Sequence, residues 1–352
     1  MSNPLEPAVF DGHNDVLLKL YRAGGLSACE KFILGDKGAI DLPRAQAGGF
    51  GGGFFAVYIP SPIDLDGKFD EMTKASYDLA LPDPIEWEDA LPVAMSQAAI
   101  LFDLEKRGAL KVCRSVDDIR GAMAAGKIAA IFHIEGAEAI DPDLHTLEVL
   151  YQAGLRSIGP VWSRNTIFGH GVPFRFPSDG DIGPGLSDHG LRLVKRCNEL
   201  GIMIDLSHLN SAGFWDVARH SDKPLVATHS NVHSICPHSR NLTDDQLAAI
   251  KDSEGMVGLN FAVAFLREDG RMIDEVPLTQ MLRHLDYLIE HLGENHVGLG
   301  SDYDGAIVPT ELTSVADLPN LRQAMVNHGY SDTLITKLCH GNWLSVLEKT
   351  WG

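Results

Sequence analysis

The hydrophobic pattern of the chain consists of short apolar runs separated by longer amphipathic segments. Most runs are apolar at consecutive positions, as expected for parallel strands that are covered on both faces. Eight runs predict strands at residues 8–10, 54–59, 128–134, 157–162, 202–206, 224–229, 256–260 and 296–300. Because helical patterns separate most of these runs, the sequence predicts a (β/α)8 TIM-type barrel rather than an open sheet.

Capping signals mark two of the intervening helices. One helix is predicted over residues 185–201, with Ser187 as its N-cap and Gly201 at its end. A second is predicted from Thr243, where a hydroxyl precedes two acidic residues, to Gly255. Both patterns support the alternation of strands and helices.

Two segments interrupt the alternation. Residues 60–110 predict an insertion after the second strand, made of an acidic loop and a long helix, and residues 164–184 predict a long Gly/Pro-rich loop after the fourth strand. Both follow strand ends, so we expect them on the C-terminal face of the barrel, where barrel enzymes build their sites. No repeat or linker divides the chain, which predicts a single domain over residues 1–352.

Composition and charge narrow the classes of partner. The 352 residues are 45% apolar and carry a formal charge of −19, which would repel nucleic acid and anionic lipid. The five cysteines form no CxxC pair, which fits a reduced compartment better than a disulfide framework. No signal pattern and no apolar stretch long enough to span a bilayer is present. We therefore expect a soluble, cytoplasmic protein that binds neither nucleic acid nor membrane.

Potential metal ligands stand at the ends of the predicted strands. His13 and Asp15, in the segment VFDGHND, follow the first strand, and a polar turn is the alternative reading of this pair. Further candidates follow the third, fifth, sixth and eighth strands: Glu135, His208, His229 and Asp302. Any one of them could simply cap a helix or pair with a lysine or arginine. Barrel closure, however, would collect all of these groups in one small volume, where unpaired charges are costly and metal ions would supply positive charge.

The ligand count predicts two metal ions. His13 with Asp15 and His208 with His229 provide two ligands to each site, and Glu135 offers two oxygens to bridge them. Nitrogen and oxygen ligands without thiolate suit Zn²⁺, although Mn²⁺, Co²⁺ or Fe²⁺ would also fit. A carbamylated lysine is a poorer bridge, because Lys127 precedes the third strand. Such a pair of metals binds a hydroxide between them.

Asp302, in the segment GSDYDG, remains for proton chemistry. It could take a proton from the bridging water and deliver it to a leaving amine. The alternatives are that Asp302 is a further ligand or that Asp304 has this role. Asp304 and Asp11 are interpreted as turn residues or as residues that orient the ligands.

The segments DGHND, HIEGAEAI, WSRN, DLSH, ATHSNVHSICPHSRNLTD and GLGSDYDG together resemble the renal, or membrane, dipeptidases over nearly the whole chain. The resemblance implies an amidohydrolase-type barrel with two zinc ions that hydrolyses dipeptides, often with a C-terminal D-residue. It assigns His13 and Asp15 to one zinc, His208 and His229 to the other, Glu135 to the bridge and Asp302 to acid/base catalysis. It also suggests a homodimer.

The resemblance adds two substrate contacts and shows one departure. It implies that Arg240 binds the C-terminal carboxylate of the substrate, which a guanidinium can hold through two parallel hydrogen bonds, and that Tyr58 borders the substrate pocket. Membrane-bound members place a histidine that stabilises the oxyanion after the fourth strand, where this chain has Trp162. Asn165 or His170 from the following loop, or the metals, would then replace that donor.

Two alternative functions stay open. The same barrel could hydrolyse another amide, a lactone or a phosphotriester, because one metal pair supports several such cleavages. The chain could also be a non-catalytic binding protein, but retention of every expected ligand together with Asp302 argues against this. Asp15 in place of a second histidine separates the chain from HxH deaminases and nucleases. The sequence therefore predicts a zinc-dependent dipeptidase.

Overall fold

Eight parallel strands form the barrel of this chain, whose computed structural model describes residues 6–62 and 66–352. Their order is β8-β6-β5-β2-β1-β11-β10-β9, and a parallel bridge between Asp205 and Val226 joins the two ends of this row. All eight predicted runs form barrel strands, so the predicted TIM-type fold is confirmed. The strands are β1 (Val9–Asn14), β2 (Phe50–Tyr58), β5 (Ile128–Glu135), β6 (Leu155–Gly159), β8 (Met203–Ile204), β9 (Val226–Ala227), β10 (Met256–Asn260) and β11 (Val297–Gly300).

The barrel strands are buried on both faces because a different apolar cluster covers each face. In β5, Ala129 and Ile131 belong to the cluster inside the barrel, whereas Ala130 and Phe132 belong to the outer cluster beneath the helices. The two-residue period of a strand produces this alternation. It also explains why the strands read as continuous apolar runs rather than as alternating patterns.

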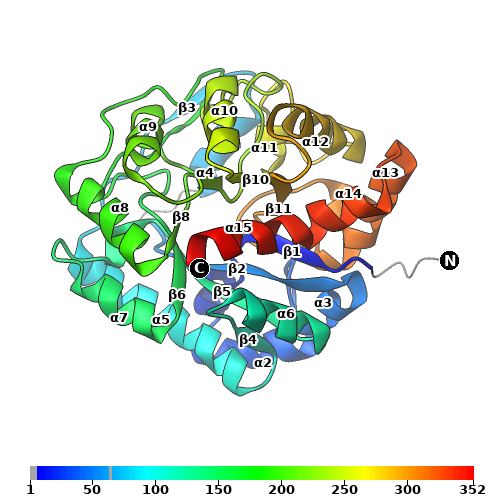
Figure 1. Cartoon of the computed structure of the whole chain (residues 1–352), viewed down its shortest axis with the longest axis horizontal. Helices are drawn as coiled ribbons and strands as arrows, with labels where there is room; N and C mark the ends of the chain where they lie inside the picture. The colour runs from blue at the N-terminus through cyan, green and yellow to red at the C-terminus, as the bar shows by residue number, and fades with distance from the viewer. Residues whose placement is uncertain (1–5, 63–65) are drawn as a thin grey trace.

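Helices surround the barrel (Figure 1). The capping predictions hold for α8 (Asp188–Leu200), where Ser187 Oγ accepts a hydrogen bond from Gly190 N and Gly201 is left-handed. The helix predicted from Thr243 is α10 (Asp244–Asp252), which ends three residues before the predicted Gly255. The remaining helices of eight or more residues are α5 (Trp87–Lys106), α6 (Val116–Ala124), α7 (His145–Ala153), α9 (Ser211–His220), α12 (Leu278–Leu292), α13 (Leu318–His328) and α15 (Asn342–Trp351).

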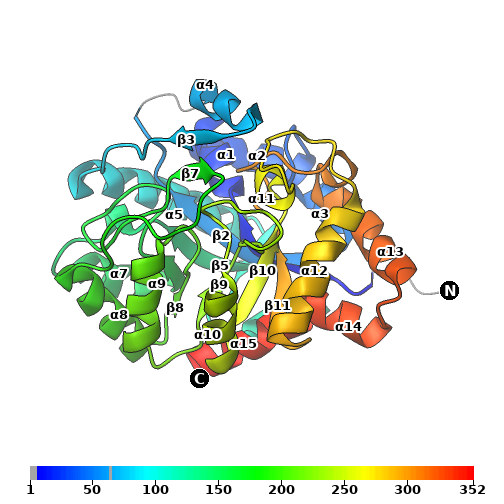
Figure 2. The ribbon, with the colours of Figure 1, turned by 90° about the horizontal axis from the view of Figure 1, so that it is seen from above.

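The two interruptions meet at one end of the barrel. The insertion contains the expected long helix α5 but also β3 (Tyr77–Leu79), and β4 (Leu110–Val112) begins at its last residue; the sequence did not predict either strand. β3 pairs in antiparallel fashion with β7 (Phe174–Phe176) from the long loop, and Figure 2 shows this small sheet at the opposite end from α15. The part of the insertion at residues 63–65 lies outside the described residues. Together, the two segments cover the end of the barrel where the strands terminate.

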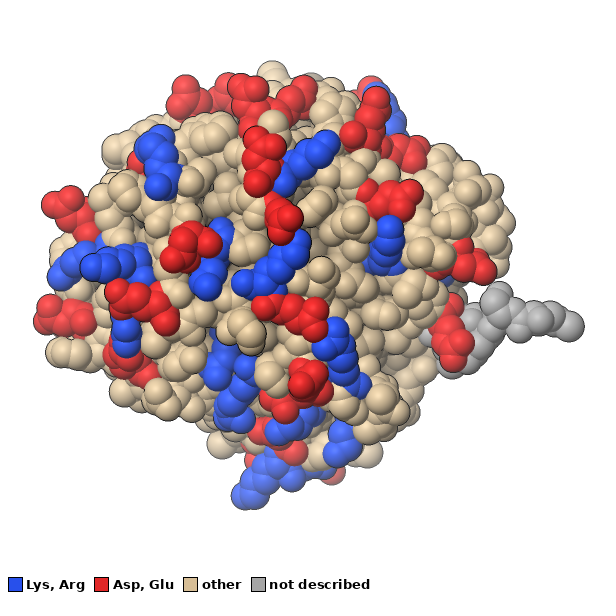
Figure 3. Space-filling view, viewed as in Figure 1, with Lys and Arg blue, Asp and Glu red and all other residues tan. Residues whose placement is uncertain are grey.

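Helix α15 closes the other end of the barrel. Its Trp343 is fully buried and donates a hydrogen bond from Nε1 to Leu299 O at 3.0 Å. A Cβ atom at Gly12, Gly258 or Gly298 would lie within 2.6–2.9 Å of the indole, so these strands provide space for it by lacking side chains. Around α15, acidic and basic side chains are interspersed (Figure 3), so the net charge does not form a single acidic field on that face.

Candidate metal centre and active site

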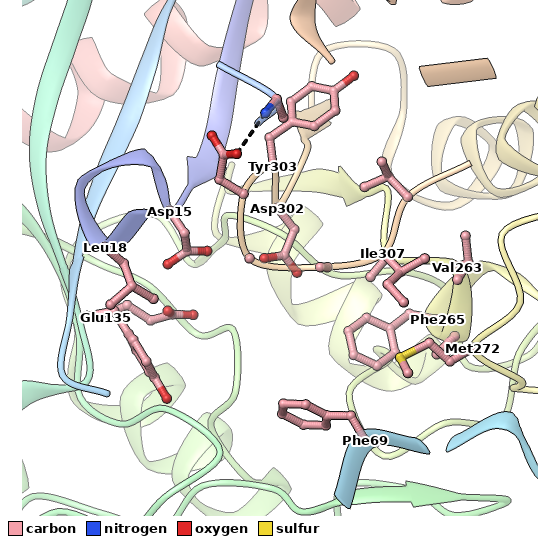
Figure 4. A pocket seen from close by; sticks show the side chains of 18 of the residues that line it. Asp15, Leu18, Phe69, Glu135, Val263, Phe265, Met272, Asp302, Tyr303 and Ile307 are labelled. Carbon is pink, nitrogen blue, oxygen red and sulfur yellow. Dashed lines mark hydrogen bonds between the residues drawn. The ribbon is translucent and has the colours of Figure 1, made fainter. Parts of the chain in front are cut away.

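The predicted ligands meet at the carboxyl ends of the barrel strands. His13 lies in β1, Asp15 stands at the N-cap position of helix α1 (Val16–Arg22) without a side-chain capping hydrogen bond, and Glu135 is the last residue of β5. His208 and His229 follow β8 and β9 within four and two residues. Figure 4 shows the carboxylates of Asp15, Glu135 and Asp302 around one cavity. The structure thus brings together the groups that the sequence placed at separate strand ends.

A bulge in β1 sets the direction of His13. Between Asp11 and Asn14, β1 advances three residues while β2 advances two, from Gly53 to Phe55. Such an extra residue re-aims the side chains beside it. As a result, the ring of His13 lies inside the barrel, with its centroid 3.9 Å from that of His229.

Glu135 connects the two halves of the ligand cluster. Its Oε1 lies 3.0 Å from His208 Nε2 and 3.4 Å from His229 Nε2. Its Oε2 lies 3.7 Å from His13 Nε2, which in turn is 3.4 Å from Asp15 Oδ2. Each carboxylate oxygen of Glu135 therefore faces a different pair of ligands, as a bridging group requires.

Hydrogen bonds at Nδ1 leave the Nε2 atoms of two histidines free to bind a metal. Thr228 Oγ1 donates to Asp205 Oδ2 at 2.5 Å and therefore accepts from His229 Nδ1 at 2.8 Å. Ser163 Oγ lies 2.8 Å from His208 Nδ1. The two Nε2 atoms lie only 3.1 Å apart. Ring nitrogens oriented in this way by outer partners are characteristic of metal sites.

The electrostatics of the cluster also fit metal ions. Burial lowers the pKa values of His208 and His229 well below normal, so both imidazoles are neutral and able to act as ligands. Burial also raises the pKa of Glu135 well above normal, with Asp15 and Asp302 adding to the shift. Burial alone would lower the pKa of His13, but Glu135, Asp15 and Asp302 raise it to about 10. Buried carboxylates in excess over cations create a demand for positive charge. The donor set therefore fits the predicted metals.

Asp302 lies beside the cluster in a strained backbone conformation. Its φ is +61°, and that of His208 is +66°, values that are uncommon for residues other than glycine and that concentrate at functional sites. The Asp302 N–H donates to His13 O at 3.0 Å, and its Oδ2 accepts from Asn260 Nδ2 at 2.9 Å. Burial raises the pKa of the Asp302 carboxyl group. One ligand atom each of His13, Asp15 and Asp302 lies within 4.8 Å of the others, so these three residues could also hold a metal ion together.

Arg240 is buried behind the cavity wall and is not itself among the described residues that line the cavity. Its Nη2 donates to His229 O at 3.2 Å, and its Cζ lies 5.4 Å from the ring centroid of Phe265, which lines the cavity. Its Nε has no hydrogen-bond partner in the described structure. Burial lowers the pKa of Arg240 to about 10, whereas Asp302 and Glu135 oppose this shift. A buried guanidinium with an unused donor is suited to bind an anionic group.

The cavity in front of the cluster measures about 930 Å³. Tyr58 and Trp162 form part of its wall, with ring centroids 5.1 Å apart, and Trp162 lies 5.7 Å from the ring of His208. Behind them Arg164 is fully buried, binds Glu138 Oε1 through Nε and Nη2, and lies 5.7 Å from the Tyr58 ring. This ion pair holds the aromatic wall in place.

The other candidates have structural contacts. Asn165 Oδ1 accepts from Gly171 N, and neither Asn165 nor His170 is among the described residues that line the cavity. Asp11 accepts hydrogen bonds from the N–H and Oγ of Ser301, and burial raises its pKa to about 7. Asp304 accepts from the N–H groups of Ala39 and Ile40 and pairs with Lys19. Lys127 immediately precedes β5, at the far end from Glu135.

A sequence model of the membrane dipeptidase family, peptidase family M19, matches residues 5–351. The chain belongs to this family. As a member of the membrane dipeptidase family it is a metallo-dipeptidase, and the predicted family, fold and enzyme class are confirmed. None of the helices in residues 6–62 and 66–352 is long and apolar enough to cross a membrane.

Similar proteins support this placement in the membrane dipeptidase family. A metallo peptidase from Rhodobacter sphaeroides, solved with a phosphinate mimic of the dipeptide L-Ala-D-Ala, is 54% identical; the match covers 98% of this chain and 99% of that one, with a TM-score of 0.96. An uncharacterized protein from the pqqA 5′ region of Klebsiella pneumoniae is 48% identical over 75% of this chain and 98% of its own length. Dipeptidase verJ from Clonostachys rogersoniana is 29% identical over 88% of this chain and 75% of its own.

Three residues in the site were missed from the sequence. Asp205 and Thr228 orient His229, and Asn260 binds Asp302. Each of them lies at or just beyond the end of a barrel strand. A polar residue at the carboxyl end of a barrel strand is a signal that could have identified them.

Proposed function

We propose that the chain is a dipeptidase with two zinc ions that cleaves dipeptides, including those with a C-terminal D-residue. The observation that carries the proposal is the position of Glu135, whose two carboxylate oxygens face three buried imidazoles beside Asp302. His13 and Asp15 would hold one ion and His208 and His229 the other, and Glu135 would contribute one oxygen to each. When bound, the metal ions would polarise the substrate carbonyl and lower the pKa of a water molecule.

Asp302 moves the proton in this proposal. Asn260 engages its Oδ2, so Oδ1 is the atom that takes a proton from the attacking water and delivers it to the leaving amine. The raised pKa of Asp302 favours such an exchange, because a carboxyl group that binds a proton more tightly is a better base. The fixed, left-handed backbone at this residue holds the carboxylate in position.

Arg240 binds the free carboxylate of the substrate. The unused Nε of its guanidinium and its burial beside Phe265 give it a strong preference for an anionic group. Longer peptides place an amide where a dipeptide has this carboxylate, so the contact selects dipeptides. The support for a C-terminal D-residue is the L-Ala-D-Ala mimic bound to the similar metallo peptidase from Rhodobacter sphaeroides.

The transition-state oxyanion needs a donor other than the family histidine. Trp162 occupies the cavity wall close to His208, and its indole provides a neutral N–H but no cation. Neither Asn165 nor His170 is among the described residues that line the cavity, so bound metal ions would supply this stabilisation.

The test is a hydrolysis screen combined with metal analysis of the same sample. Purified protein is assayed on L,L- and L,D-dipeptides and on matched tripeptides, and its metal content is measured by mass spectrometry. We expect two zinc ions per chain, turnover of dipeptides of both kinds and none of tripeptides. Turnover of tripeptides, or a single bound metal in fully active protein, would refute the proposal. Sedimentation velocity on this sample tests the predicted homodimer.

A further inference from the structure

We propose that Arg22 selects dipeptides whose N-terminal residue carries an acidic side chain, an inference that rests on the proposed function. Arg22 is the last residue of α1, is exposed, and lines the same cavity as Asp15, Glu135 and Asp302. It is not one of the predicted ligands or catalytic residues. Its position instead suits recognition of the substrate.

One face of α1 leads from the metal centre to Arg22. Asp15, Leu18 and Arg22 are spaced by three and four residues, so they lie on the same side of the helix, and all three line the cavity. At 1.5 Å per residue, Arg22 stands about 10 Å beyond Asp15 along this face. Figure 4 shows Asp15 and Leu18 beside Glu135. A ligand that extends from the metals along α1 therefore passes Leu18 and reaches Arg22.

The charge of Arg22 is available to a ligand. Among the described residues lining the cavity, Arg44 is the other cation, and it forms an ion pair with Asp41. Lys19, on the same helix as Arg22, is paired with Asp304. No ion pair or hydrogen bond of the Arg22 side chain is present in the described structure. An unpaired guanidinium in a binding cavity favours an anionic partner.

The proposed orientation of the substrate directs its N-terminal residue towards α1. The substrate carboxylate is bound by Arg240, which belongs to the segment after β9. Helix α1 follows β1, which is three strands away from β9 in one direction around the barrel and five in the other. The candidate ligands lie between these two sides, where His13 of β1 meets His229, which follows β9, with ring centroids 3.9 Å apart. With its carboxylate on the β9 side, the dipeptide extends its other end towards Leu18 and Arg22.

A second free charge in the cavity provides a matched comparison. Asp70 lines the cavity, and no ion pair of its carboxylate is present in the described structure. A carboxylate there disfavours the same acidic substrates that Arg22 favours. Replacing Asp70 by asparagine and Arg22 by glutamine should therefore change the preference for an acidic residue in opposite directions.

The experiment compares Glu-Ala with its neutral isostere Gln-Ala in zinc-loaded enzyme, with alanine in the configuration that the wild type cleaves faster. We expect the wild-type kcat/KM to favour Glu-Ala by about three- to ten-fold, since an exposed charge pair contributes modestly. R22Q should abolish this preference and leave Gln-Ala within about two-fold. R44Q should retain the preference, D70N should increase it, and 0.5 M NaCl should weaken it in the wild type.

Three results would overturn the proposal: equal or inverted rates for the two substrates in the wild type, an unchanged preference in R22Q, or cleavage of Ala-Ala without cleavage of either test substrate. Turnover of Ala-Ala tests the proposed function separately, because its methyl side chain cannot reach Arg22. If fully zinc-loaded wild type did not hydrolyse Ala-Ala, this result would count against the proposed dipeptidase function itself.

Discussion

Asn260 holds Asp302 by a 2.9 Å hydrogen bond from its Nδ2 to the Oδ2 of the carboxylate. Replacing Asn260 by alanine leaves that oxygen without its partner and frees the carboxylate to rotate. We expect kcat to fall by about five- to hundred-fold, corresponding to the loss of a hydrogen bond to a charged group, while KM changes little. Steady-state kinetics on one dipeptide, with D302N as the more severe reference, measure this effect. Unchanged kcat in N260A would show that Asp302 needs no such support.

Replacing Arg240 by alanine removes the group proposed to bind the substrate carboxylate. We expect kcat/KM for a dipeptide to fall by at least about 100-fold, because a charge-assisted contact at a buried site is lost. Hydrolysis of a neutral ester or lactone should be far less affected. For a dipeptide, the kcat/KM of R240K should lie between those of the wild type and R240A, because lysine keeps the charge but not the planar fork. Equal losses on charged and neutral substrates would assign Arg240 a structural role.

Replacing Glu135 by glutamine should reduce binding at both metal sites, since its two oxygens face different ligands. We expect less than one retained zinc per chain after dialysis, and loss of activity that added zinc restores only in part. D304N is the matched control, because Asp304 lines the same cavity but bonds to Lys19 and backbone N–H groups. The zinc content per chain of both variants is measured after dialysis. Two zinc ions retained by E135Q would show that Glu135 does not bridge the two metal sites.

His284 is expected to make the fold sensitive to acid at a distance from the metal centre. It is buried, accepts a hydrogen bond at Nδ1 from Val232 N and lies 2.9 Å through Nε2 from Leu266 O, and burial lowers its pKa to about 4. The unfolded chain binds a proton near pH 6.5, whereas the folded chain does so only near pH 4. The contribution of neutral, buried His284 to the free energy of unfolding is therefore complete above pH 6.5 and is lost as the pH falls to 4.

Urea unfolding of the wild type and H284Q tests this pH dependence. The stability of the wild type relative to the variant should decrease by up to about 3 kcal/mol between pH 7 and pH 4. The difference between the two proteins isolates His284 from the other buried histidines. A difference that is independent of pH would show that His284 titrates alike in both states.

The barrel could be predicted from the sequence because the signals for its strands and helices are local. Consecutive apolar residues in β5 and the caps of α8 each follow from a few neighbouring positions. The pairing of Tyr77 with Phe176 could not be predicted, because it joins two three-residue strands from distant segments. Short strands of this kind carry almost no periodic signal.

The candidate site shows the same limit. His13, Glu135 and His229 could be recognised by their types and by their places at strand ends. The bulge in β1 that directs His13 inward depends on the register between two strands, which no single segment encodes. Likewise, the buried ion pair between Arg164 and Glu138 could not be predicted, because the two residues come from separate segments that meet only in the folded chain.

The indole of Trp343 also bears on how the enzyme is made. The strands around it contribute glycines, so the barrel interior remains incompletely filled until α15 is in place. During synthesis at the ribosome, His13 and Asp15 emerge more than 300 residues before that helix. If His13 and Asp15 bind metal as proposed, their site forms only after α15 has been synthesised and packed into the barrel.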